Sequence, residues 1–478
     1  MLKHPNIGNN NFKTPNSVSR VLADRFPYEP TQDQIRFFQA AQEFVMSSEP
    51  LTTLLLKGYA GTGKTSLIAV LVKVLPSFGY KVRLLAPTGR AAKVLARYSR
   101  KSAFTIHKMI YQLRQGAEAH GMVFKLKKNY SSNTIFMVDE ASMIPEGDLN
   151  NRVLSDLIKY IFQHENNKLI LIGDNAQLPP VGQSQSLALS GSHLKQRYGL
   201  YISSLELNQV MRQSLNSGIL KNANHIRMAL GGNGFKINFT LNQPDIFKMS
   251  GERLEDGLRY AYDKYGIAET VVICRSNKNA VFYNRNIRHA IFYFEEELEA
   301  GDQIMVVRNN YFYKPEHSPM GFLANGEFAE VVKILKLEER YGYRFADIEI
   351  RLTDDPANQI LSVKVILDTL HSDYPSLTDQ QYRALAQQVM EDYQDLKGRE
   401  VKEVVKTDPY LQALQIKFAY AMTCHKSQGG QWKAIFLDKG YVPAEQQDQD
   451  FLRWLYTGVT RATDELFLVN FEDSYFSI

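Results

Sequence analysis

The sequence predicts an α/β protein with parallel sheets that are flanked by helices and divided between at least two domains. A glycine-rich loop at residues 58–65 lies between an apolar segment with the length of a strand and a segment with helical spacing. Two later apolar segments end in polar residues, as strands of a parallel sheet do at their carboxyl edge. The 478 residues also exceed the usual size of a single domain core.

The glycine-rich loop is the first element to justify. Residues 51–57 are predicted to form a strand, and residues 65–75 a helix that ends before Pro76. The pattern GxxxxGK[ST] between them lets backbone N–H groups hold phosphates at a helix N-terminus. Lys64 would reach the terminal phosphates, and Thr65 would offer its hydroxyl to Mg²⁺. The other loop residues assigned to the nucleotide are Gly58, Ala60, Gly61, Thr62 and Gly63.

The next predicted strand ends in two carboxylates. Residues 136–138 are apolar, and Asp139 and Glu140 follow them directly. We expect Asp139 to be a Mg²⁺ ligand and Glu140 to be the base that polarises an attacking water. Such a pair also occurs on solvated surfaces, but the phosphate-binding loop upstream favours the catalytic interpretation.

A third apolar segment, residues 169–172, leads into Asp174 and Gln177. If both strands belong to one parallel sheet, these polar ends lie side by side. We then expect Asp174 to contact the nucleotide and Gln177 to sense the γ-phosphate. The alternative is a simple turn before Pro179 and Pro180.

Composition limits the possible partners and location. The net charge of +5 is only mildly basic, so any nucleic-acid contact must come from a localised groove. No apolar run has transmembrane length and the N-terminus lacks a signal-peptide pattern, so we expect a cytoplasmic protein that does not bind membranes. Cys274 and Cys424 fit neither a disulfide framework nor a zinc site, and we expect buried thiols.

Six further segments accompany these elements in a fixed order. They are Thr31-Gln32-Asp33-Gln34, Ala86-Pro87-Thr88-Gly89-Arg90-Ala91-Ala92, Thr105-Ile106-His107-Lys108, Leu207-Asn208-Gln209-Val210-Met211-Arg212-Gln213, Thr423-Cys424-His425-Lys426-Ser427-Gln428-Gly429 and Tyr456-Thr457-Gly458-Val459-Thr460-Arg461-Ala462. Their order and spacing resemble those of superfamily 1 helicases, and within them the 5′→3′ group, superfamily 1B, that contains the phage Dda and bacterial RecD-type helicases. The resemblance spans nearly the whole chain.

The resemblance implies two RecA-like P-loop NTPase domains that bind ATP and Mg²⁺ between them. It assigns Gln34 to adenine recognition, and Gln428 and Gly429 to the nucleotide. Arg461 and Arg212 would be arginine fingers that stabilise the charge of phosphoryl transfer. Surface arginines in solvated ion pairs are the alternative for both residues.

The resemblance also implies a set of strand contacts. These residues are Thr88, Arg90, Thr105, His107, Thr423, His425 and Lys426. Short hydroxyls and cations suit phosphates rather than base edges, so binding would not depend on sequence. Either histidine alone would more often be structural. The expected partners are single-stranded DNA and single-strand/duplex junctions, with no small-molecule substrate beyond ATP; we expect a monomer, and the sequence indicates no protein partner.

The motifs divide the chain into predicted domains. Residues 1–29 form an N-terminal arm and residues 30–204 the first RecA-like domain, with a β-hairpin insertion near 112–129. Residues 205–307 and 412–478, with strands at 270–274 and 418–420, form the second. Residues 308–411 form an insertion, for which the resemblance implies an SH3-like barrel, with a helix over 377–396 that Thr378 opens.

The predicted function is an ATP-dependent DNA helicase that moves 5′→3′ on single strands and unwinds duplexes. The alternatives are an RNA-directed motor of the same superfamily, a DNA-stimulated ATPase that does not separate strands, and an inactive scaffold, against which the intact catalytic residues argue. In relatives the hairpin projects where the duplex opens. Phe124 within it would either wedge the junction or pack the hairpin onto the first domain.

Overall fold

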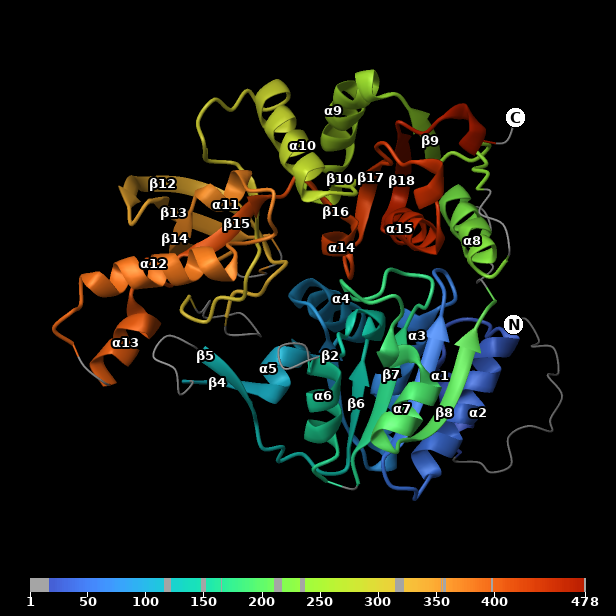
Figure 1. The fold of residues 1–478 in the computed structure, drawn as a ribbon. Helices are drawn as coiled ribbons and strands as arrows, with labels where there is room; N and C mark the ends of the chain where they lie inside the picture. The colour runs from blue at the N-terminus through green and yellow to red at the C-terminus, as the bar shows by residue number, and fades with distance from the viewer. Residues whose placement is uncertain are drawn as a thin grey trace.

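The computed structural model describes residues 17–115, 122–147, 152–164, 166–209, 217–232, 237–313, 322–353, 355, 358–396 and 399–476. Within them lie two parallel sheets, a closed barrel and a hairpin (Figure 1). The expected α/β fold class is confirmed. None of the helices in these ranges is both long enough and apolar enough to cross a bilayer.

The first sheet has six parallel strands in the order β3-β2-β6-β7-β1-β8. Its strands are β1 (Thr52–Gly58), β2 (Lys81–Ala86), β3 (Ala103–Thr105), β6 (Thr134–Val138), β7 (Lys168–Gly173) and β8 (Tyr201–Leu207). Its helices are α1 (Val18–Arg25), α2 (Gln32–Met46), α3 (Lys64–Val74), α4 (Gly89–Ser99), α5 (Ile106–Ile110), α6 (Val153–Ile161) and α7 (Gly191–Tyr198).

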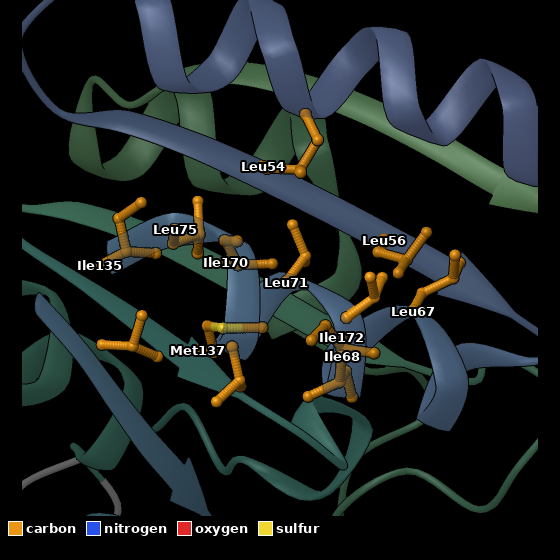
Figure 2. Close-up of a cluster of buried hydrophobic side chains, with 14 of the residues drawn as sticks. Leu54, Leu56, Leu67, Ile68, Leu71, Leu75, Ile135, Met137, Ile170 and Ile172 are labelled. Atoms are coloured by element: carbon orange, nitrogen blue, oxygen red, sulfur yellow. The ribbon is translucent and has the colours of Figure 1, made fainter. Parts of the chain in front are cut away.

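Both faces of this sheet are buried, which explains why its strands are apolar runs rather than alternating patterns. Successive residues of β1 point to opposite faces: Leu54 and Leu56 pack with α1–α4, whereas Leu55 packs with α5–α7. Figure 2 shows the first of these cores, where leucines and isoleucines of α3 lie against β1, β6 and β7. This packing fixes the start of α3 at the carboxyl end of β1.

The second sheet has five parallel strands in the order β16-β10-β17-β18-β9. They are β9 (Ile246–Met249), β10 (Thr270–Cys274), β16 (Ala421–Thr423), β17 (Trp432–Asp438) and β18 (Ala462–Val469). Its helices are α8 (Gly218–Leu230), α9 (Leu254–Tyr265), α10 (Asn277–Ala290), α14 (Cys424–Ser427) and α15 (Gln449–Val459). Both cysteines are buried here as free thiols, as expected.

A closed barrel is inserted in this second unit, at the left of Figure 1. Its strands are β11 (Gln303–Val306), β12 (Phe328–Arg340), β13 (Tyr343–Leu352), β14 (Ile360–Ile366) and β15 (Leu414–Phe418). Between β14 and β15 lie α11 (Asp368–His371), α12 (Asp379–Glu391) and α13 (Arg399–Thr407). Thr378 caps α12 in a reciprocal capping box with Gln381, which confirms the predicted helix start. The helix ends at Glu391, however, and does not extend to the predicted residue 396.

A two-stranded antiparallel hairpin, β4 (Tyr111–Gln115) and β5 (Met122–Leu126), branches from the first unit where a hairpin is predicted. The loop at its tip lies outside the described residues, and so does the side chain of Phe124. The wedge hypothesis for Phe124 therefore stays a prediction.

The structure corrects one further expectation and adds detail to two of the predicted domains. Residues 418–420 do not form one strand, because β15 of the barrel ends at Phe418 and β16 of the sheet begins at Ala421. The predicted N-terminal arm contains α1, whose Val18 and Leu22 are buried in the first core. The barrel also includes β11 and β15, which lie just outside residues 308–411. The domain boundaries themselves remain predictions.

Candidate nucleotide site and nucleic-acid groove

The phosphate-binding loop has the shape that its glycines allow. Gly61 and Gly63 have φ values of 75° and 86°, which a residue with a side chain rarely adopts. The loop leads into α3, so its N–H groups and the helix N-terminus form a site for anions. The Lys64 ammonium donates to the carbonyls of Gly58 (2.6 Å) and Tyr59 (3.0 Å), inside the curve of the loop. It therefore lies where the expected role requires a cation.

Gln34 is fully buried beneath the loop, and its amide is engaged by the protein itself. Its oxygen accepts from the Thr31 backbone N–H (3.0 Å), and its NH₂ group donates to the Thr62 carbonyl (3.2 Å). Gln34 thus fixes the start of α2 against the phosphate-binding loop. Its assignment to adenine stays a prediction.

Asp139 and Glu140 follow β6 at the edge where the loop follows β1. The Tyr98 hydroxyl donates to Asp139, and Asp139 accepts from the Glu140 N–H at 2.9 Å. Burial, with the neighbouring Glu140 charge, raises the pKa of Asp139 to about 6, while hydrogen bonds and Lys64 oppose this rise. Glu140 has a φ of 52°, a left-handed backbone conformation that is unusual outside glycine and costs energy.

Asp174 and Gln177 follow β7, next to β6 in the sheet, as predicted. Asp174 is buried and accepts from the Ala176 N–H at 2.9 Å. Burial raises its pKa, and Lys64 opposes the rise, so these two residues lie close enough to interact. The side-chain oxygen of Gln177 is buried without a hydrogen-bond partner among the described residues, which fits a residue that awaits a polar ligand or water.

The structure describes one of the two predicted arginine fingers, Arg461. Arg461 is buried at the end of α15, where it donates to the carbonyls of Thr457 (3.1 Å) and Gly430 (3.2 Å). These bonds keep its guanidinium within the second unit in this structure. Arg212 lies outside the described residues. Both finger roles stay predictions.

A cavity of about 230 Å³ brings most of the predicted strand contacts together. The predicted residues that line it are Thr88, Arg90, Thr105, His107, His425 and Lys426. Thr423 lies at a small neighbouring cavity instead. The walls thus come from the first unit and from α14 of the second. We call this cavity the groove.

The barrel contributes a third wall that sequence reasoning missed. Its residues there are Met305, Asn309, Ala324, Asn325 and Gly326. The Asn309 side chain accepts from the Asn325 N–H at 2.7 Å, which holds together the two ends of the connection between β11 and β12. No motif marks this connection, so only the folded chain reveals its position.

Burial disfavours the charged forms of the basic side chains in the groove. Burial lowers the pKa of Lys426 to about 8 and also lowers the pKa values of His425 and His107. Lys426 has no acceptor among the described residues, so an anion would regain the interactions that its ammonium loses. The Thr88 and Thr105 hydroxyls cap α4 and α5 and therefore also have a structural role.

Arg90 connects the two units as well as lining the groove. Its guanidinium lies 3.9 Å from the ring centre of Trp432 and 4.5 Å from that of Phe328, and it donates to the Gln431 carbonyl at 3.2 Å. Beside it, Lys93 of α4 forms an ion pair with the buried Glu327 at 2.9 Å.

Gln428 and Gly429 lie at this same junction rather than against the phosphate-binding loop. Gln428 lines the groove and donates to the Leu178 carbonyl at 2.7 Å. Gly429 has a φ of 73°, and a Cβ there would lie 2.8 Å from that of Ala91. A glycine is therefore required for the close approach to α4. Their nucleotide assignment stays a prediction.

Comparison with known protein families gives two matches, one in each half of the chain. A model of an AAA domain matches residues 32–236, and one of the UvrD-like helicase C-terminal domain matches residues 418–469. The first match includes the phosphate-binding loop, and the second includes the segment that contains Arg461.

Several relatives align along most of the chain. The ATP-dependent DNA helicase dda of enterobacteria phage T4 is 24% identical over 92% of this chain and 99% of its own. Uncharacterized protein R530 of Acanthamoeba polyphaga mimivirus is 25% identical over 86% of this chain and 94% of its own. The ATP-dependent RecD2 DNA helicase of Deinococcus radiodurans is 21% identical over 87% of this chain and 46% of its own.

Among solved structures, Pif1 helicase from Bacteroides in complex with ADP-AlF3 and ssDNA has a TM-score of 0.48 and 14% identity, covering 94% of this chain and 95% of its own. The two family matches and the relatives that span nearly the full chain agree with the nucleotide-site geometry. Over most of its length the protein is similar to helicases of the superfamily 1B type.

Proposed function

We propose that this protein is an ATP-dependent DNA helicase that translocates 5′→3′ on single-stranded DNA and unwinds duplex DNA. One observation supports this proposal above the others: the groove has walls from both units and from the barrel. Any change in the separation of the two units therefore changes the shape of the groove. Nucleotide-driven closure would then alter the grip on a strand, which is what stepping requires.

The nucleotide site supplies the chemistry for this movement. The loop N–H groups and Lys64 would hold the terminal phosphates, and Glu140 would orient and deprotonate the attacking water. Phosphoryl transfer depends chiefly on positioning and on charge stabilisation, so Arg461 would contribute once the units close.

The residues present also fit Mg²⁺. The Thr65 hydroxyl and the Asp139 carboxylate are hard oxygen donors, and the raised pKa of Asp139 indicates a carboxylate that a cation would stabilise in its charged form. When bound, the ion would neutralise phosphate charge. A site completed by phosphates and water needs only one or two such protein ligands.

Strand binding would be insensitive to sequence, because the groove offers a lysine, two histidines and two threonine hydroxyls rather than a shaped pocket for a base. A segment of single-stranded DNA, alone or beside a duplex, is the ligand we propose for it.

The decisive experiment measures unwinding of a short duplex that has either a 5′ or a 3′ single-stranded tail. We expect ATP-dependent unwinding of the 5′-tailed duplex only. Unwinding of the 3′-tailed duplex alone would contradict the polarity, and ATP hydrolysis stimulated by oligo-U but not by oligo-dT would indicate an RNA-directed motor.

The matched catalytic control is Glu140→Gln. Since it removes the base but keeps the size of the side chain, we expect ATP binding and strand binding to persist while turnover falls by about 10²–10⁴. Hydrolysis at the parental rate would show that Glu140 is not the base.

A further inference from the structure

Tyr456 of α15 crosses from the second unit into the nucleotide site of the first. Its side chain is 1% exposed. Its hydroxyl accepts from the Ala60 N–H of the phosphate-binding loop at 2.9 Å and donates to the Asp174 carboxylate at 2.7 Å. One oxygen of the second unit therefore joins two separate parts of the first-unit site.

Two neighbouring contacts fix the same junction. The Thr457 hydroxyl accepts from the Leu178 N–H at 2.9 Å, and Gln428 donates to the Leu178 carbonyl at 2.7 Å. The segment after β7 is thus bonded both to the end of α15 and to a residue that lines the groove.

The same turn holds Arg461. Its guanidinium donates to the carbonyl of Thr457, the residue after Tyr456, at 3.1 Å. The position of Tyr456 relative to the loop therefore determines where the Arg461 turn lies relative to the nucleotide site.

We propose that Tyr456 is a positioning residue that couples the phosphate-binding loop to the groove by holding the Arg461 turn against the first unit. This inference rests on the proposed function, because it concerns how that nucleotide site and that groove communicate.

The physical reason is that both bonds depend on the separation of the units. When the units part, the buried Asp174 carboxylate loses a donor and the Ala60 N–H loses its acceptor. Water can replace these partners only in part, since a hydrogen bond to a charged carboxylate is net stabilising, so the two bonds favour the closed arrangement. A nucleotide that favours closure then raises the affinity of the groove for a strand, and a strand that favours closure raises the affinity for the nucleotide. This mutual effect is a coupling free energy between the two sites.

The test variant is Tyr456→Phe, which keeps the ring and removes only the bridging oxygen. The chain offers a matched control in Tyr420, also 1% exposed, whose hydroxyl donates to Asp302 (3.1 Å) and accepts from the Gln303 N–H (3.1 Å). These partners lie within the second unit and the barrel, so Tyr420→Phe removes an equivalent bridge away from the nucleotide site.

For Tyr456→Phe we expect kcat for ATP hydrolysis, with and without oligo-dT, to fall about tenfold. KM for ATP should change by less than about twofold, because the ring still closes the site. Fluorescence anisotropy with labelled oligo-dT gives a second measurement. In the parent, a non-hydrolysable ATP analogue should change the Kd for oligo-dT. In Tyr456→Phe this change should be about tenfold smaller, whereas Tyr420→Phe should show the same change as the parent.

Parental kcat and parental coupling in Tyr456→Phe would overturn the inference. Equal losses in Tyr456→Phe and Tyr420→Phe would also overturn it, because they would reflect general destabilisation. A parent whose hydrolysis is not stimulated by nucleic acid would instead refute the proposed function. In that case the basal kcat of Tyr456→Phe still tests the position of the Arg461 turn.

Discussion

Asp139→Asn should make the protein more stable at neutral pH while abolishing ATP hydrolysis. The folded state raises the pKa of Asp139 from an ordinary 3.8 to about 6, chiefly through burial. Between those two values the folded chain retains a proton that the unfolded chain releases. Stability therefore falls as the pH rises through this window and stays lower above it. Asparagine removes this ionisation and keeps the shape of the side chain.

The size of the effect follows from the same two values. A rise of this extent corresponds to about 3 kcal/mol at any pH above about 6. Asp139 keeps partial solvent exposure, and Asn cannot satisfy both the Tyr98 hydroxyl and the Glu140 N–H as a carboxylate does. We therefore expect a net gain of about 1–2 kcal/mol, or an increase of roughly 2–8 °C in the unfolding temperature of the first unit.

The assay is thermal unfolding by circular dichroism at several pH values from 4 to 8, without nucleotide or divalent ions. The stability difference between Asp139→Asn and the parent should increase with pH up to about 6 and then remain constant. Adding Mg²⁺ and an ATP analogue should raise the unfolding temperature of the parent more than that of the variant. A difference that is independent of pH would refute the reasoning.

Asp33→Asn is the matched control with the opposite sign. Although burial favours its neutral form, hydrogen bonds from Arg36 and from the N–H groups of Gln209 and Asn208 hold the pKa of Asp33 below its usual value. Its ionised form therefore stabilises the fold above the unfolded pKa, and this contribution is lost as the pH falls through the folded pKa. Asp33→Asn should destabilise the protein at neutral pH.

Two further predictions concern the groove. Lys426→Ala should reduce the slope of log Kd against log salt for oligo-dT by roughly 0.7, because one phosphate contact is lost; an unchanged slope would place Lys426 outside the strand path. Arg90→Lys should keep the charge but lose the stacking on Trp432 and Phe328, which is worth about 0.5–2 kcal/mol. In anisotropy titrations we therefore expect the nucleotide-dependent change in DNA affinity to be about 2- to 30-fold smaller than in the parent. A parental response of Arg90→Lys would show that the stacked arginine does not couple the units.

The elements around the nucleotide were predictable from sequence because local patterns determine them. Lys64, Asp139 and Asp174 each follow an apolar run that forms a central strand, so the topology of a parallel sheet brings their side chains to one edge. The capping residue Thr378 was likewise evident, since a capping box needs only four consecutive residues.

Other features depend on contacts between distant parts of the chain. Residues 418–422, which link the end of β15 to β16, are continuously apolar, so periodicity could not show that the chain passes there from a barrel into a sheet. The amide of Gln34 is satisfied by Thr62, and Arg90 finds its aromatic partners in the second unit. Those partners become visible only once the chain is folded.

The short passage from barrel to sheet has a mechanical consequence. Only Ala419 and Tyr420 separate β15 from β16, and both are held in place: the Ala419 N–H donates to Gln303 (2.9 Å) and the Tyr420 hydroxyl donates to Asp302. A buried pair of hydrogen bonds from Arg288 of α10 to Asp302, at 2.8 and 2.9 Å, fixes the other connection of the barrel. Because both connections are hydrogen-bonded to neighbouring elements, we expect the barrel to turn together with the second sheet. A fluorophore at Leu337, in the exposed half of β12, would then report rotations that move His425 and Lys426 toward the first unit or away from it.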